Sequence, residues 1–139
     1  AVVITNAQNS GIAVQVATVN NAIQHWRQLY FGTADNSGNA ANTYDADGDG
    51  LVNLLEYAFG LNPTSGTSLS PPQAQIVGNN FTTNFTGVSG VTYAAEWSST
   101  LLPGDWTSIT DTGAGDQHTF SVTRGSNPQL FMRLRVTSP

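Results

Sequence analysis

The sequence predicts a mainly β fold, an antiparallel β-sandwich of the jelly-roll-like type into which a helix–loop–helix is inserted. Two observations carry this prediction. From residue 79 onward, apolar and polar residues alternate in short runs that are separated by glycine-rich and proline-containing turns, as in antiparallel strands. Before that point, residues 22–31 and 53–59 follow helical spacing on either side of a polar, acidic stretch.

The first nineteen residues predict two strands, over 2–5 and 12–19. In the second of them, Ile12, Val14 and Val16 share one face. The sequence NSG at 9–11 predicts a turn between the strands. An apolar pair of strands at this position needs a partner surface, which is either the chain's own sheet or that of a neighbour.

A helix is predicted over 22–31, because Ile23, Trp26 and Tyr30 recur at helical spacing. Asn20 or Asn21 is placed as its N-cap, and Gly32 as the glycine that ends it. Residues 33–44 form a polar loop of small residues.

A second helix is predicted from about residue 53 to 59. Gly60 suits the left-handed position after the helix, and Pro63 prevents its continuation. Residues 64–72 have the composition of a linker.

The remaining chain predicts five or six strands. Their apolar positions should form most of the core. The strands are expected within 79–87, 91–97, 106–110, 118–123 and 130–136, and the buried residues should be Phe81, Phe85, Tyr93, Trp97, Phe120, Val122, Leu130, Met132 and Leu134. Since 139 residues are the usual size of one domain, the prediction is a single domain, 1–139, made of an N-terminal strand segment (1–19), a helical part (20–63) and a β part (64–139).

The segment 45–56 matches the pattern D-x-D-x-D-G-x5-E of a calcium-binding EF-hand loop without a mismatch. It holds four of the nine acidic residues of the chain. Oxygen ligands in this number favour Ca²⁺ over Mg²⁺. The predicted ligands are the carboxylates of Asp45, Asp47 and Asp49, the Leu51 carbonyl, Asn53 directly or through water, and Glu56 with both oxygens.

The acidic segment and its surroundings have two other interpretations. A solvated acidic turn that caps a helix explains the aspartates, but it does not explain Gly50 and Glu56 at their offsets. A second loop with Asp35, Ser37 and Asn39 lacks the carboxylate at its twelfth position. A single loop favours structural ion binding, because sensors usually couple paired loops to a helix opening.

The stretch DADGDGLVNLLEYAFGLNP resembles the calcium segments of thrombospondin type 3-like and dockerin-like bacterial proteins. It is most similar to C-terminal modules of planctomycete and verrucomicrobial surface proteins. There, a Trp-containing helix precedes the acidic loop, and a small β-domain with a Y-x-x-E-x-S-x-x-L…W pattern follows. The matching residues here include Trp26, Tyr57, Gly60 and Pro63, then Tyr93, Glu96, Ser98, Leu101, Trp106 and 131–136. The resemblance implies a secreted, non-catalytic, calcium-stabilised module, and residues 1–20 lie outside it.

Other polar and aromatic residues favour ordinary structural roles. His118 and Asp116 near a turn lack a nucleophile. Glu96 and Asp105 are the carboxyl groups of a candidate glycosidase pair, but Glu96 alternates out of phase with Tyr93 and Trp97 and is expected to face solvent. Trp106 is a candidate for stacking on a sugar. Asn80 and Asn84 each fit a glycosylation pattern, N-x-[ST].

The chain carries a net charge of −5 and no lysine, which excludes nucleic acid as an expected partner, and no apolar run is long enough for membrane insertion. Few charges, many Asn and Thr and no cysteine suit an extracellular or cell-surface β-protein. We therefore expect no enzyme, but a structural protein that forms a homo-oligomer or filament through residues 1–19. The alternative is a monomeric carbohydrate-binding or cell-surface attachment module, with glycans as partners.

Overall fold

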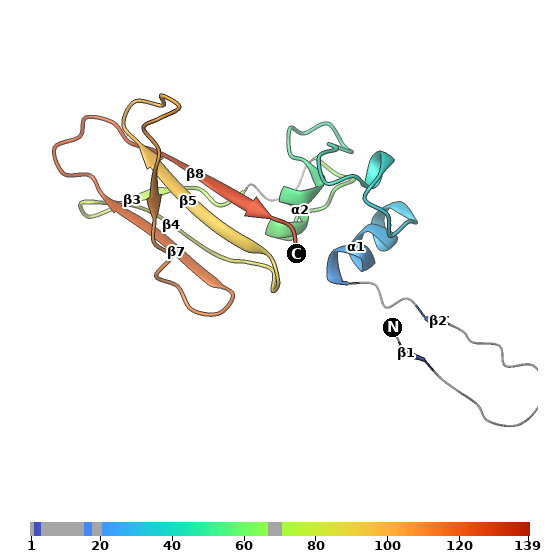
Figure 1. Cartoon of the computed structure of the whole chain (residues 1–139). Helices are drawn as coiled ribbons and strands as arrows, with labels where there is room; N and C mark the ends of the chain where they lie inside the picture. The colour runs from blue at the N-terminus through green and yellow to red at the C-terminus, as the bar shows by residue number, and fades with distance from the viewer. Residues whose placement is uncertain (1, 4–15, 18–20, 67–70) are drawn as a thin grey trace, which may run out of the picture.

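The computed structural model describes residues 2–3, 16–17, 21–66 and 71–139. The fold is mainly β, with six antiparallel strands in two three-stranded sheets, accompanied by two α-helices (Figure 1). The helices are α1 (Ala22–Phe31) and α2 (Asn53–Phe59), with a short 3₁₀ helix η1 (Gly38–Ala40) between them. The strands of the two sheets are β3 (Gln75–Val77), β4 (Asn80–Thr86), β5 (Thr92–Ser98), β6 (Thr107–Ile109), β7 (Gln117–Thr123) and β8 (Phe131–Thr137).

Helix α1 begins with a capping box, as the sequence predicts for one of two asparagines. The Asn21 side chain accepts a hydrogen bond from the Gln24 backbone N–H at 3.0 Å, and the Gln24 side chain accepts one from the Asn21 N–H at 2.8 Å. The helix ends at Gly32, whose φ of 73° is the left-handed conformation that glycine adopts without steric cost. Both ends of α1 are therefore set by local sequence.

The two sheets have the strand orders β3-β4-β7 and β6-β5-β8, and all pairs are antiparallel. Strand β3, with the sequence QIV, comes in addition to the five strands that the alternation of apolar and polar residues predicts. An isolated bridge between Asp111 and Phe120 joins the sheets on the side of β6 and β7. Strands β3 and β8 are the outer strands on the other side.

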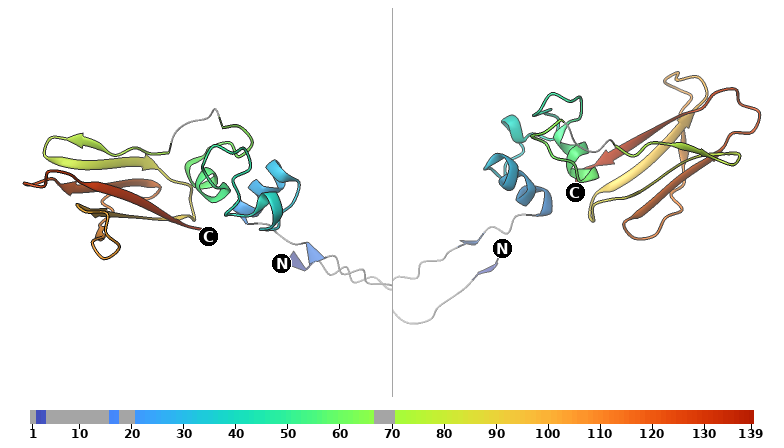
Figure 2. Two further views of the ribbon diagram at one scale, coloured as in Figure 1. Left: turned by 90° about the horizontal axis from the view of Figure 1, so that it is seen from above. Right: turned by 180° about the vertical axis from the view of Figure 1, so that it is seen from behind.

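The core runs from the helices into both sheets. Its buried members are Ile23 of α1, Tyr57 and Ala58 of α2, Val91, Tyr93 and Ala95 in and before β5, and Phe120 of β7. The Tyr93 hydroxyl donates to the Ala58 carbonyl at 2.6 Å and accepts from the Val88 N–H at 2.8 Å, so a buried hydrogen bond ties β5 to α2. The views from above and behind place the helices at one end of the sheets, beside the C-terminus (Figure 2).

The predicted core residues lie on the correct faces of the strands, but the prediction counts too many of them as buried. Of its nine members only Tyr93 and Phe120 are buried, while Phe85, Met132 and Leu134 are half-buried against the core. Phe81, Trp97, Val122 and Leu130 are half-exposed and lie outside the core cluster. Arg133 and Arg135 point outward as expected. The reason for the difference is that α2 and the start of β5 form the centre of the core, and part of the space between the sheets stays unfilled.

The described parts of the N-terminal segment form a ladder of their own. Strand β1 (Val2–Val3) pairs antiparallel with β2 (Val16–Ala17), in register Val2 with Ala17 and Val3 with Val16. Within the described residues, neither strand joins the two larger sheets. Figures 1 and 2 place this ladder beyond α1, away from β3–β8. The rest of the predicted strands 2–5 and 12–19 lies outside the described residues, as does part of the predicted linker 64–72.

Among the described residues, no helix combines the length and the apolar character that a bilayer crossing requires.

Candidate metal centre

The acidic loop brings the three predicted aspartates together. Carboxylate oxygens of Asp45, Asp47 and Asp49 all lie within 4.8 Å of one another, so this cluster could hold a metal ion. Two glycines make the turn possible, because Gly48 and Gly50 have φ values of 79° and 95° that other residues rarely adopt.

Backbone N–H groups hold these carboxylates in place. Asp45 accepts from the N–H of Gly48 at 2.7 Å and from that of Gly50 at 2.9 Å. Asp49 accepts from the Leu51 N–H at 2.8 Å. At the base of the loop, the N–H of Asn53 donates to the Tyr44 carbonyl at 2.8 Å. The loop is thus closed on itself, and its aspartates keep further lone pairs for another partner.

Glu56 is the fourth carboxyl group of the motif. It lies in α2 with an exposed fraction of 1%, and its Oε2 is buried without a hydrogen-bond partner. Burial and the negative charges of Asp47, Asp49 and Asp45 raise the pKa of Glu56 to about 7. Among the described residues, the carboxylates that lie within 4.8 Å of one another are those of the three aspartates, and Glu56 is not in that group. A buried carboxyl group that experiences three negative charges is strongly destabilised when ionised unless a cation compensates it.

Asn53 is also buried, with an exposed fraction of 1%. Its side-chain N–H₂ donates to the carbonyls of Asn39 and Ala41, each at 2.8 Å, which anchors the η1 turn to the start of α2. Its Oδ1 is buried without a partner, as is Oδ2 of Asp47. Only Oδ1 of Asn53 is therefore left for an ion or for a water bound to it.

The chain preceding the acidic loop is held by Arg27, which sequence reasoning did not single out. Its guanidinium is buried in α1 and donates to Oδ1 of Asn42 at 2.6 Å. Burial lowers the pKa of Arg27, and the interaction with Tyr57 partly opposes this. Ser37 directly precedes η1. Among the described residues, Asp35 belongs to no cluster of three side chains that could hold a metal ion.

The segment after α2 packs against the acidic loop. A Cβ atom at Gly66 would lie 2.9 Å from the Cβ of Asp49 and 3.8 Å from Oδ1 of Asp47. Only glycine permits this approach without a shift of the loop. Nothing in the spacing of the motif indicates this contact, because it depends on how the chain returns after Pro63.

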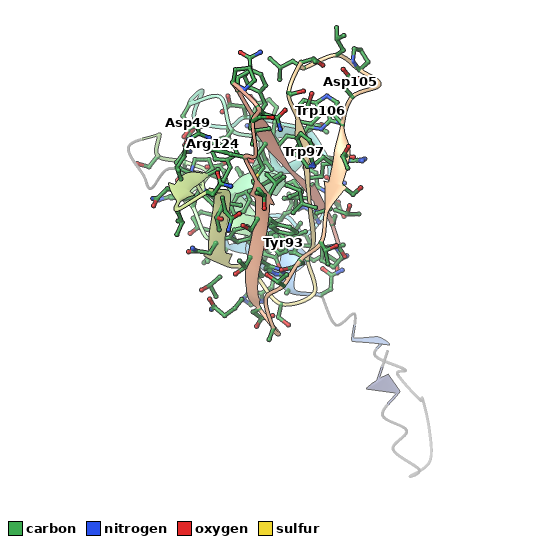
Figure 3. All side chains as sticks on the ribbon, turned by 90° about the vertical axis from the view of Figure 1, so that its left-hand side faces the viewer. Asp49, Tyr93, Trp97, Asp105, Trp106 and Arg124 are labelled. Atoms are coloured by element: carbon green, nitrogen blue, oxygen red, sulfur yellow. The ribbon has the colours of Figure 1, made fainter. Side chains whose placement is uncertain are left out.

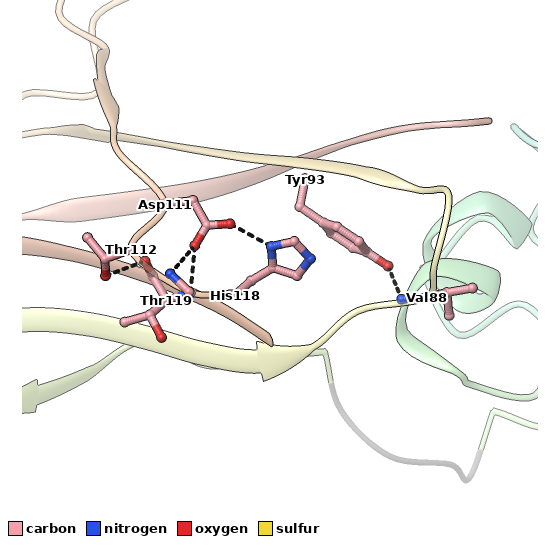
Figure 4. Close-up of polar contacts among 7 residues, drawn as sticks. Val88, Tyr93, Asp111, Thr112, His118 and Thr119 are labelled. Atoms are coloured by element: carbon pink, nitrogen blue, oxygen red, sulfur yellow. Dashed lines mark hydrogen bonds and ion pairs between the residues drawn. The ribbon is translucent and has the colours of Figure 1, made fainter. Parts of the chain in front are cut away.

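His118 has an acidic partner, but it is Asp111 and not the neighbouring Asp116. Its Nδ1 lies 2.6 Å from Oδ2 of Asp111, whose Oδ1 accepts from the Thr119 N–H at 2.9 Å (Figure 4). The His118 ring packs against Tyr93, with ring centroids 4.6 Å apart. Among the described residues, no hydroxyl group hydrogen-bonds its other nitrogen.

Trp106 carries a cation on one face. The guanidinium carbon of Arg133 lies 4.0 Å from the centroid of its ring, and Nε of Arg133 lies 2.8 Å from Oε2 of Glu96. Trp106 is seen near Asp105 in Figure 3, at the far side of the strands from Arg124. Glu96 is therefore engaged in an ion pair, and Asp105 accepts a short hydrogen bond from Thr100.

The two candidate glycosylation sites, Asn80 and Asn84, are exposed on β4. Asn80 accepts a hydrogen bond from the Thr123 hydroxyl at 3.0 Å. Both share one face of the strand, opposite Phe81 and Phe85.

Comparison of the chain with protein-family models, with curated proteins and with solved structures finds no match.

Proposed function

We propose that the acidic loop binds Ca²⁺ and that the ion is structural. The single observation that carries this proposal is Glu56, a buried carboxyl group with an unpartnered oxygen that is electrostatically coupled to three clustered aspartates. Asp45, Asp47, Asp49, Glu56, the Leu51 carbonyl and Oδ1 of Asn53 would hold the ion. An oxygen-only donor set of this size suits Ca²⁺. The bound ion would supply the positive charge that compensates the carboxylates.

The consequence of ion binding would be mechanical. Glu56 belongs to α2, which packs on the core through Tyr57 and Ala58 and is hydrogen-bonded to Tyr93 of β5. An ion held between the loop and Glu56 would therefore fix the loop to the helix, and through the helix to the sheets. No step of chemistry is needed for this role, and we propose that the protein is not an enzyme.

The test is calorimetry with added Ca²⁺ and with a chelator, with Mg²⁺ as the control ion. Extracellular loops bind Ca²⁺ at roughly 10⁻⁴–10⁻³ M. A modest excess of ion should then stabilise the fold by about 1–2 kcal/mol and raise the melting temperature by several degrees. An unchanged melting temperature would exclude the structural role of the ion.

We further propose that the protein is a subunit of an extracellular fibre or cell-surface assembly, joined by exchange of the N-terminal strand. The support is that β1 and β2 pair with each other and, within the described residues, with no other strand. Two-stranded ladders are marginal on their own in water, so an apolar segment of this kind needs a further partner. Six strands in two facing sheets also leave room for added strands in an eight-stranded jelly-roll-like sandwich. The likeness to secreted bacterial surface modules, which is carried by the acidic loop, supports the same location.

Deletion of residues 1–9 tests the assembly. We expect the full chain to form large particles in solution and the shortened chain to stay monomeric while it still binds Ca²⁺. A shortened chain that forms the same particles would rule out strand exchange. The alternative, a glycan-binding module, is less favoured because the Arg133 guanidinium already covers one face of Trp106. Retention of a monomer on glycans would reverse this preference.

A further inference from the structure

The two sheets are joined on one side and open on the other. On the closed side, Asp111 bridges to Phe120. On the open side, β3 and β8 each pair with one neighbour only, within the described residues. We call the space between β3 and β8 the seam. Strand β8 presents an unpaired edge of seven residues there, which is a template for another strand.

The seam holds two cavities. The larger, of about 390 Å³, lies between α2 and both sheets, and Phe59, Phe81, Met132 and Leu134 are among its lining residues. The smaller, of about 180 Å³, is lined by Ile76, Phe81 and Leu130 together with Arg124 and part of the 124–130 turn. An apolar cavity of roughly 150 Å³ accommodates one benzene molecule. The larger cavity therefore has room for at least two branched aliphatic side chains.

The residues that face the cavities are those that the alternation pattern assigns to the core. Phe81, Leu130, Met132 and Leu134 are only half-buried. Residues 71–74 also line the larger cavity, but they leave it unfilled. Phe81 lies on β4, Leu130 directly precedes β8, and Met132 and Leu134 lie on β8, so these four side chains meet at the seam.

We propose that the seam is the acceptor site for the N-terminal strand of a second copy of this chain, with residues 2–5 added along the free edge of β8. The proposal rests on the assembly proposed above and names the surface that it uses. Two features identify the occupant. Residues 1–20 contain no ionisable side chain, and all but Arg124 of the residues that line the cavities are uncharged. The chain's own β1 lies beyond α1, away from the seam (Figures 1 and 2).

The spacing of side chains fits this occupant. Leu130, Met132 and Leu134 recur every second residue, a step of about 6.6 Å along an extended chain. Val2 and Ile4 have the same spacing and can point into the seam, while the backbone of residues 2–5 pairs with β8. Main-chain hydrogen bonds would supply affinity, and the cavities would select the aliphatic side chains.

Cross-linking tests the contact in the full chain, which has no cysteine. Thr5→Cys provides the donor thiol. Gln73→Cys provides the acceptor thiol, since Gln73 is exposed and lines the larger cavity. Ser108→Cys, exposed on β6 at the opposite edge of the sheet that contains β8, is the control acceptor. Because a disulfide requires Cα atoms within about 7 Å, we expect mixtures of T5C with Q73C to give at least ten times more mixed dimer than T5C with S108C.

A second pair of variants fills the seam or leaves it open. Ala74→Trp introduces a large ring at the wall of the larger cavity, whereas Ala94→Trp places the same ring on the exposed face of β5. We expect A74W to raise the protein concentration needed for assembly at least tenfold, measured by light scattering, while its calcium-dependent melting temperature follows that of A94W.

The outcomes separate the two proposals. Equal cross-linking to Q73C and S108C, or equal assembly of A74W and A94W, would overturn the seam while strand exchange stands. A T5C/Q73C double variant that cross-links only within one chain would show that the chain's own N-terminus covers the seam, which also overturns the proposal. A full chain that stays monomeric at every concentration, with no cross-link in the mixtures, would overturn the assembly together with the seam.

Discussion

Glu56 combines two properties that conflict in the absence of a cation. It is completely buried, and it lies near three aspartates whose charges raise its pKa. The buried Oε2 has no donor to satisfy it. At the scale of single residues, the fold therefore bears a local cost at this position, and ion binding would remove that cost.

Replacement of Glu56 by Gln should remove the stabilisation by the ion without destabilising the ion-free fold. We expect E56Q to melt at or above the temperature of the parent protein in a chelator, because one of the mutually repelling charges is gone. In the parent, added Ca²⁺ should stabilise the fold by about 1–2 kcal/mol and raise the melting temperature. In E56Q this rise should be almost lost. Glu96→Gln is the matched control, since Glu96 pairs with Arg133 and lies outside the motif. If E56Q keeps the full calcium response, Glu56 is not a ligand.

Gly66 provides a second test at the residue scale. In Gly66→Ala, the new Cβ would lie 2.9 Å from the Cβ of Asp49, too close for two such atoms, so the acidic loop must shift. We expect the calcium affinity measured by titration calorimetry to fall roughly tenfold, about 1.4 kcal/mol. Gly104→Ala is the control, because a Cβ there meets no atom within 4 Å. Equal affinities in the two variants would mean that the packing of Gly66 does not position the loop.

At the scale of elements, the hairpin between β6 and β7 is held by one carboxylate. Oδ1 of Asp111 accepts N–H groups of Gly113 and Thr119, each at 2.9 Å, and Oδ2 pairs with His118. Burial by itself would raise the pKa of Asp111, but the hydrogen bonds from His118, Thr119 and Gly113 outweigh it and lower the pKa. Asp111 also forms the bridge that joins the sheets.

This pairing predicts an acid-dependent contribution to stability. Since the pKa of Asp111 is lower in the folded protein than its unfolded value near 4, its contribution is complete above about pH 4 and is lost as the pH falls through the folded pKa. We expect Asp111→Asn to melt below the parent at pH 5 and the two to converge by about pH 2. Asp111→Ala also removes Oδ1, which accepts from the N–H groups of Gly113 and Thr119, and should cost about 1 kcal/mol more at each pH. A pH-independent difference between parent and D111N would contradict the assignment.

At the scale of the whole molecule, α2 connects the acidic loop to the seam. Glu56 faces the loop, and Leu55 and Phe59 of the same helix line the larger cavity. A displacement of α2 would therefore change the acceptor surface. This arrangement couples the two proposed sites through one short, packed element.

The coupling predicts that assembly depends on calcium. We expect a chelator to raise the concentration at which the full chain assembles by roughly tenfold, about 1.4 kcal/mol, with restoration by Ca²⁺ and not by Mg²⁺. Light scattering at constant ionic strength measures the effect. In E56Q, assembly should no longer respond to either treatment. Assembly of the parent that is equally strong with and without the chelator would mean that the ion and the seam are independent.

The sequence alone determined the elements whose signals are local. These signals are an asparagine cap at position 20 or 21, the stop at Gly60, the turn glycine Gly50 and the alternation in β4, β5, β7 and β8, each set by residues a few positions apart. The structure places the cap at Asn21, as a capping box. The cluster of three aspartates belongs to the same class, because Asp45, Asp47 and Asp49 stand at every second position of one turn.

The tertiary structure decided what depends on distant segments. It paired His118 with Asp111, which the distance along the chain does not indicate, and it brought Gly66 against Asp49. It also moved the centre of the core from the strands toward α2, which left Phe81 and Leu130 half-exposed at the seam. Alternation reports which face of a strand is apolar, but whether that face is covered depends on how the sheets and helices pack, and a local pattern carries no information about that packing.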